Sequence, residues 1–116
     1  MSNEQAAEST GRAWLALVDA GKYAQTWADA AALFKKSIDQ PTWQKQVDGV
    51  RSPLGKLLSR KTTSRRYTKT VPGGPDGDYV ILMFETRFEN KQSALETVTP
   101  MKDPDGSWRV SGYFIR

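Results

Sequence analysis

The sequence predicts an α+β domain in which three N-terminal helices pack on one face of a four-stranded antiparallel sheet. Apolar residues recur at helical spacing through the first half of the chain, and the second half contains strand-like runs separated by turn residues. Helices and antiparallel strands that are segregated along a chain are typical of α+β domains. At 116 residues the chain suffices for one hydrophobic core, so we expect a single domain over residues 1–116.

The helical half divides into three segments, preceded by residues 1–4, which we expect to be disordered. Residues 5–20 form the first helix, and Gly21 ends it in the left-handed conformation. Residues 23–37 form the second. Asp39 caps the third helix, and Pro53 kinks or ends it. The residues at helical spacing are Ala6, Ala13, Trp14, Leu17 and Val18, then Tyr23, Trp27, Ala30, Ala31 and Phe34, then Trp43, Val47 and Val50.

Four strands are expected over residues 59–71, 79–89, 92–101 and 107–116. The first is polar and rich in Thr and Arg, which is typical of an exposed edge strand. A long connection rich in Gly and Pro follows it over residues 71–78. It lacks the Lys-Ser or Lys-Thr of a phosphate-binding loop, and we expect no cofactor.

The turns set the expected register of the last three strands. A two-residue turn at Asn90 and Lys91 places Glu85 opposite Glu96, and Arg87 then lies diagonally from Glu96. One sheet face would hold Ile81, Met83, Val98, Trp108, Val110 and Phe114, together with Glu85, Arg87 and Glu96. The other would hold Leu82, Phe84, Phe88, Leu95, Met101, Tyr113 and Ile115. Because both faces are partly apolar, the sheet needs a second cover besides the helices, and a homodimer through the sheet supplies one.

Composition excludes several kinds of chemistry. The chain has no Cys and no His, so it has no disulfide, thiol nucleophile, His general base or zinc site built on these residues. No apolar run approaches the roughly 20 residues that span a bilayer. The first residues resemble no signal peptide. A chain that begins after an export signal would look the same. The sequence is therefore compatible with a periplasmic or secreted protein if such a signal precedes it, and with a cytoplasmic one otherwise.

The formal charge of +4 has a local source. No acidic residue lies between Asp48 and Asp76, whereas seven Lys and Arg side chains fall within residues 51–69. A solvated edge strand protected by its charges is the favoured interpretation. The alternative is binding of an anionic polymer, with Tyr67 as a stacking residue for a nucleic-acid base.

The expected Glu85–Glu96 pair is the position of greatest chemical interest. Two carboxylates that face each other need a cation or a shared proton. Arg87 is the expected cation. The favoured interpretation of the pair is an ion-pair ladder on a half-exposed sheet. The alternative is a polar pocket for acid–base chemistry or for a cationic ligand.

Several segments together resemble an uncharacterised bacterial family known as domain of unknown function 4019. They are residues 14–23, 27–34, 43, 51–55, 75–80, 96–99 and 105–114. The resemblance implies a cystatin-like cone of the nuclear-transport-factor-two type, with helices cradled by a bent sheet. Members of that superfold often dimerise through the sheet and hold a pocket inside the cone. Its dehydratases rely on an Asp–His pair, which this chain lacks.

Three functional hypotheses follow. The first is a non-enzymatic binding or accessory domain for a small ligand or peptide, with a pocket formed by Trp43, Arg51, Tyr67, Glu85, Arg87 and Glu96. The second is an isomerase-like enzyme in which Glu85 or Glu96 acts as general base. The third is an anionic-polymer binder that uses residues 51–69, with affinity that falls steeply as salt rises.

Overall fold

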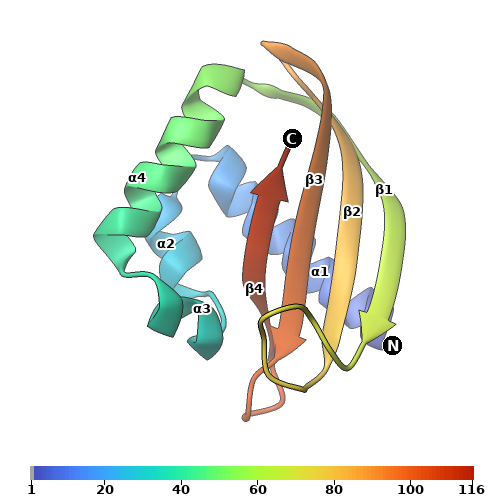
Figure 1. The fold of residues 1–116 in the computed structure, drawn as a ribbon. Coiled ribbons are helices and arrows are strands. Elements are labelled where there is room, and N and C mark those ends of the chain that lie inside the picture. The colour runs from blue at the N-terminus through green and yellow to red at the C-terminus, as the bar shows by residue number, and fades with distance from the viewer. Residues whose placement is uncertain (1) are drawn as a thin grey trace.

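The computed structural model describes residues 2–116 and confirms the α+β class (Figure 1). The helices are α1 (Asn3–Asp19), α2 (Tyr23–Ala28), α3 (Ala32–Ser37) and α4 (Gln40–Arg51), followed by the 3-10 turn η1 (Ser52–Leu54). The strands are β1 (Leu57–Thr68), β2 (Tyr79–Phe88), β3 (Lys91–Lys102) and β4 (Trp108–Ile115). They form an antiparallel sheet in the order β1-β2-β3-β4, so β1 is an edge strand as predicted.

Helix α1 begins earlier than expected. Ser2 caps it, because the Ser2 hydroxyl accepts a hydrogen bond from the Gln5 backbone N–H and the Gln5 side chain accepts one from the Ser2 N–H. This reciprocal capping box closes the first turn of α1, which therefore includes Asn3 and Glu4. Met1 lies outside the described residues.

The predicted second helix is in fact two short helices, α2 and α3. The chain leaves the helical path at Ala30 and Ala31, both fully buried. The Ala31 N–H donates to the Val110 carbonyl on the edge of β4 at 2.8 Å. Methyl side chains let the backbone approach the sheet this closely, and the bond to β4 replaces a helical one.

Helix α4 matches its prediction. The Asp39 carboxylate accepts a hydrogen bond from the Thr42 N–H at 2.9 Å, and the helix ends at Arg51, just before Pro53. Its inner face presents Trp43 and Val47 to the core.

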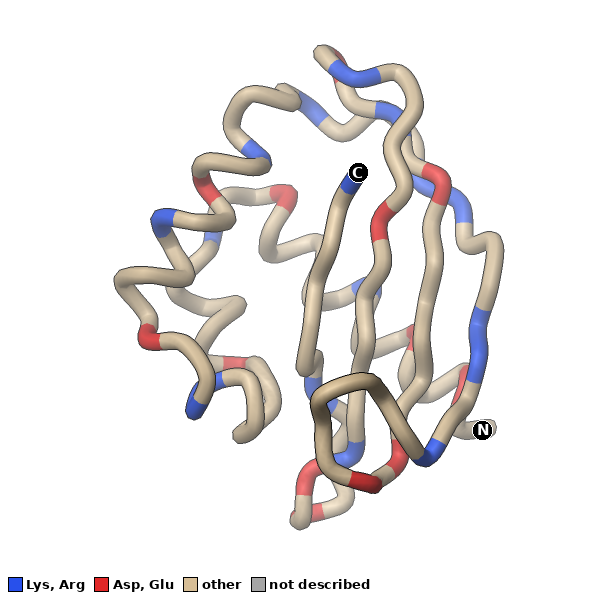
Figure 2. Tube along the Cα trace, viewed as in Figure 1, with Lys and Arg blue, Asp and Glu red and all other residues tan. Residues whose placement is uncertain are grey.

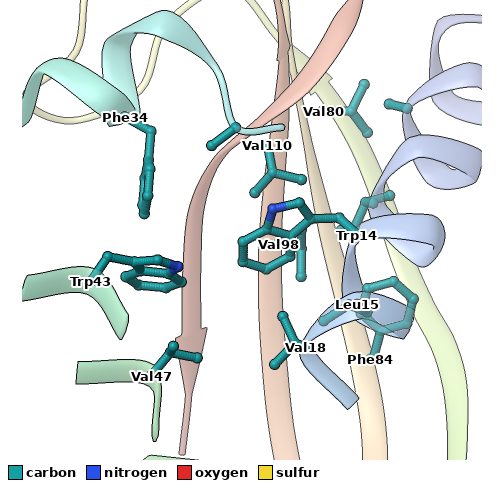
Figure 3. Close-up of a cluster of buried hydrophobic side chains, with 13 residues drawn as sticks. Trp14, Leu15, Val18, Phe34, Trp43, Val47, Val80, Phe84, Val98 and Val110 are labelled. Atoms are coloured by element: carbon teal, nitrogen blue, oxygen red, sulfur yellow. The ribbon is translucent and has the colours of Figure 1, made fainter. Parts of the chain in front are cut away.

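The core lies between the helices and one face of the sheet (Figure 3). Helix α1 contacts all four strands. Gly11 permits this contact, since a Cβ atom there would lie 2.6 Å from Leu82 Cδ1. The Trp14 and Trp43 rings lie 6.1 Å apart, and both indole N–H groups donate to Thr26, to its carbonyl and hydroxyl respectively. No helix in residues 2–116 is long and apolar enough to cross a membrane.

The register between β2 and β3 is one residue away from the prediction. Phe84 lies opposite Glu96, and Glu85 lies opposite Leu95. The turn falls at residues 89–90, and the pairing shifts between Thr86 and Phe88. A slip of one residue moves every side chain to the other face. The predicted Glu85–Glu96 pair is therefore wrong, and Glu96 and Val98 of β3 lie on the face opposite to the predicted one. The β2 side chains and Tyr113 are grouped as predicted, with Leu82, Phe84, Phe88 and Tyr113 on one face.

The two faces are distinct in the structure. The inner face buries Val80, Leu82, Phe84, Thr86, Phe88, Glu96, Val98 and Val110. The outer face, which the helices leave uncovered, carries Ile81, Met83, Glu85, Arg87, Leu95 and Thr97, flanked by Lys61 and Arg66 of β1 and Phe114 of β4. Phe114 is 72% exposed, so the outer face keeps an apolar strip.

Candidate functional site

A cluster of charged side chains is buried on the inner face, at the end where α1 and α4 terminate and the turn between β2 and β3 lies (Figure 1). It contains two acids, Asp19 and Glu96, and two guanidinium groups, Arg51 and Arg60. We call these four residues, with Thr86 and Tyr113, the buried ionic cluster. Its formal charges balance, as burial of ions requires.

Glu96 is the fully buried centre of the cluster. Its Oε1 accepts hydrogen bonds from Arg60 Nε at 2.7 Å and from the Thr86 hydroxyl at 2.6 Å. Its Oε2 accepts from Arg60 Nη2 at 3.2 Å and from the Tyr113 hydroxyl. A carboxylate has about four acceptor positions, so the capacity of Glu96 is used up.

Arg60 joins Glu96 to Asp19. Its Nη1 and Nη2 donate to the two Asp19 oxygens at 2.8 and 3.0 Å, so every nitrogen of Arg60 is engaged. Burial alone would lower the pKa of Arg60, but the hydrogen bonds to Asp19 and Glu96 outweigh it and raise the pKa. Burial, and then the charge of Glu96, likewise raise the pKa of the Tyr113 hydroxyl. The cluster keeps Arg60 charged and Tyr113 neutral.

Arg51 is the one guanidinium of the described cluster with donors to spare. The residue is 5% exposed, and its Nη2 donates to Asp19 Oδ1 at 2.9 Å. Its guanidinium carbon lies 4.6 Å from the centre of the Phe88 ring. Within residues 2–116, the buried atoms Nε and Nη1 of Arg51 have no hydrogen-bond partner. Such atoms are rare in folded proteins.

Two hollows lie near the cluster, one lined by Tyr113 and the other by Arg51. One, which we call the α4–β4 groove, has a volume of about 270 Å³ and lies between Trp43, Gln46, Val47 and Val50 of α4 and Tyr113, Phe114 and Ile115 of β4. The other has a volume of about 410 Å³ and includes Arg51 itself, with Asp19, Tyr23 and Lys56 in its wall. The α4–β4 groove is predominantly apolar, and Val50 on its wall is 45% exposed. Residues 2–116 contain no group of three or more side chains placed to hold a metal ion.

The structure brings together three of the six predicted pocket residues. Trp43 lines the α4–β4 groove, and Arg51 and Glu96 belong to the buried ionic cluster. Tyr67 is half-buried elsewhere, and its hydroxyl donates to Asp78.

Glu85 and Arg87 lie on the outer face, away from the cluster. Arg87 donates to the Gln92 side chain at 2.9 Å, so it does not neutralise Glu96 as predicted. Arg60 of β1 does so instead. Glu85 and Arg87 share a polar hollow of about 420 Å³ with Lys61 on that face.

The basic segment over residues 51–69 is not a continuous basic surface. Arg51 and Arg60 are turned into the core, and Arg65 pairs with Glu8 at 3.2 Å. Of the remaining basic residues, Lys61 and Arg66 lie on the edge strand β1, and Lys56 and Lys69 lie just beyond its two ends (Figure 2). This arrangement agrees better with a protected edge than with a nucleic-acid groove.

Sequence reasoning missed Asp19, Arg60 and Tyr113. Asp19 carried a signal, because an acid in the last turn of a helix opposes the helix dipole and needs a cation to compensate it. Arg60 was indistinguishable from its basic neighbours in the sequence. Tyr113 was expected on the face of Leu82 and Phe84, where it lies, but the expected register put Glu96 on the other face.

Comparison with known proteins places this geometry in a wider context. A family model described as "Protein of unknown function (DUF4019)" matches residues 10–113. The match includes every residue of the buried ionic cluster. No curated protein is significantly similar to the chain.

Proposed function

The chain belongs to the DUF4019 family, and from that premise we propose that it is a non-enzymatic domain that binds a small ligand or peptide in the α4–β4 groove. The family description states no activity, so the proposal depends on geometry. It accords with the cystatin-like cone that the sequence resemblance implied, in which the pocket lies between helices and sheet.

The observation that carries the proposal is an apolar hollow that opens next to buried charges. Trp43 and Val47 form its floor, and Val50 and Ile115 its rim. Ligand sites are typically apolar hollows with a few well-placed polar groups. Here the polar groups are Tyr113, which lines the groove, and the cluster behind it.

The state of the two glutamates argues against the isomerase alternative. A general base needs a free acceptor position within reach of substrate. Glu96 is fully buried and all its acceptor positions are occupied. Glu85 lies on the outer face, exposed to solvent. Glu96 therefore serves structure rather than proton transfer.

We also propose that the chain forms a homodimer through the outer face of the sheet. Phe114, Met83 and Leu95 supply apolar surface, and that face carries both Glu85 and the cations Lys61 and Arg87. A face with both signs of charge can complement itself across a two-fold axis. Light scattering should therefore report a dimer, and Phe114→Glu should shift it toward monomer. A wild-type monomer at high concentration would overturn the dimer.

Binding in the groove is tested by NMR titration with two neutral probes, hexanol and hexanamide. Amide shifts should concentrate in α4 around Val47 and in β4 around Tyr113. Val50→Glu should weaken binding, because it places a charge on the apolar rim. Gly49→Glu is the matched control, since Gly49 lies on the same helix as Val50 and is also exposed, but it does not line the groove. Shifts scattered over the surface, or equal effects of the two variants, would contradict the proposal.

A further inference from the structure

We propose that the natural ligand of the α4–β4 groove is an organic acid with an apolar body, whose carboxylate binds the guanidinium of Arg51. This inference rests on the proposed binding function and adds the chemical class of the ligand. Its basis is the pairing of an apolar groove with a buried cation that has unused donors.

The hydrogen-bond inventory of the cluster singles out Arg51. A guanidinium has five N–H groups. Each nitrogen of Arg60 already donates to Asp19 or Glu96. Arg51 donates from Nη2 alone, which leaves the N–H groups of Nε and Nη1 without an acceptor among residues 2–116. A ligand that brings acceptor oxygens to these atoms would complete the cluster.

Neighbouring side chains hold the Arg51 guanidinium in a fixed orientation. Asp19 fixes Nη2, and the Phe88 ring lies against the guanidinium plane at 4.6 Å. A guanidinium that is held before the ligand arrives loses little freedom on binding.

The position of Arg51 on α4 connects it to the groove. Val47 lines the groove, and Arg51 follows one helical turn later on the same buried face. From β4, Tyr113 also lines the groove, and the charge of Arg51 opposes the rise in the pKa of the Tyr113 hydroxyl. Arg51 is thus close to Tyr113, which separates it from the groove, and it lines the neighbouring hollow.

The walls and the cation together favour an amphiphilic acid over other anions. A carboxylate makes charge-assisted hydrogen bonds with a guanidinium, which are stronger than those of a neutral carbonyl. Inorganic anions would gain nothing from Trp43, Val47 and Val50, whereas an alkyl or aromatic body would displace water from them.

The test is an NMR titration with hexanoate and with hexanamide, which has the same length and no charge. Hexanoate should bind the wild-type groove about tenfold or more tightly than hexanamide and should shift the Arg51 Nε–H signal. Arg51→Met should abolish the preference while hexanamide still binds. Val50→Glu should weaken hexanoate binding because of charge repulsion at the exposed rim, and Gly49→Glu should leave it nearly unchanged. If Arg51→Met fails to fold, the preference of the wild-type protein for hexanoate and the shift of its Arg51 Nε–H signal still test the inference, and absence of either would overturn it.

The outcomes separate the two proposals. Equal affinity for both probes in the groove would overturn the carboxylate inference and leave the binding function intact. Hexanoate binding that survives Arg51→Met would overturn the carboxylate inference in the same way. If hexanol, hexanamide and hexanoate all fail to perturb α4 and β4, both proposals are wrong.

Discussion

Replacing each of the two glutamates by glutamine should have very different effects on stability. Glu96→Gln keeps the shape of a fully buried side chain but removes its charge and replaces one acceptor oxygen with a donor. The new amide N–H₂ group then faces the donors of Arg60. Glu85→Gln changes an exposed side chain on the outer face, so it serves as the matched control.

The magnitude follows from the contacts of Glu96. Breaking a buried ion pair by removing one partner costs about 3–5 kcal/mol. Because glutamine retains one acceptor oxygen for Arg60 or a hydroxyl, we expect the lower end, about 3 kcal/mol. A surface substitution such as Glu85→Gln changes stability by about 0.5 kcal/mol or less.

Urea unfolding, followed by tryptophan fluorescence, measures both changes, since Trp14 and Trp43 lie in the core. In the register expected from the turn residues, the two carboxylates would face each other, and either substitution would relieve repulsion and stabilise the protein. Equal effects of the two variants, or a loss below about 1 kcal/mol for Glu96→Gln, would therefore refute the observed register and the role of the cluster.

Three further predictions concern packing and pH. Gly11→Ala should destabilise the protein by about 1–2 kcal/mol, because the added Cβ atom meets Leu82. Gly49→Ala should stabilise it by up to about 1 kcal/mol, because the space around Gly49 is open and alanine favours a helix. Thermal unfolding compares the stability of the two variants. Burial and Glu96 raise the pKa of Tyr113, so the folded state keeps a proton that the unfolded state releases above about pH 10, and stability falls as pH rises there. Urea unfolding in that range should show a shallower fall for Tyr113→Phe, and an unchanged slope would contradict this. Hydrogen bonds from Arg109 lower the pKa of Asp105 from 3.8 to about 2, so the stability that Asp105 contributes is lost as pH falls through this interval. In acid unfolding, Asp105→Asn should therefore lose less stability over this interval than the wild-type protein.

The sequence predicted the order of elements because their signals are local. Asp39 and Pro41 mark the start of α4, and Gly21 ends the α1 turn with a φ of +74°. The alternation of apolar residues located β2 and β3 to within one or two residues. Helix periodicity also identified Trp14 and Trp43 as core residues.

The register could not be obtained in the same way, because it depends on one residue at a turn. The turn lies at residues 89–90, and the irregularity next to it, between Thr86 and Phe88, puts the β3 side chains on the face opposite to the predicted one. A second irregularity between Val98 and Pro100 shifts the pairing of β4, so that Tyr113 lies opposite Val98 and on the same face as Glu96. Bulges of this kind leave little trace in a single sequence. The buried ionic cluster was hidden for the same reason, since Arg60 and Glu96 meet only in the observed register.

The proposed role of Arg51, which lies beside Tyr113 and the apolar groove, is to receive the carboxylate of a ligand. A crystal structure of the protein grown with hexanoate tests it most directly. We expect density in the α4–β4 groove with a carboxylate oxygen about 3 Å from Nε or Nη1 of Arg51. Hexanoate bound elsewhere, or bound in the groove with its carboxylate turned to solvent, would contradict it.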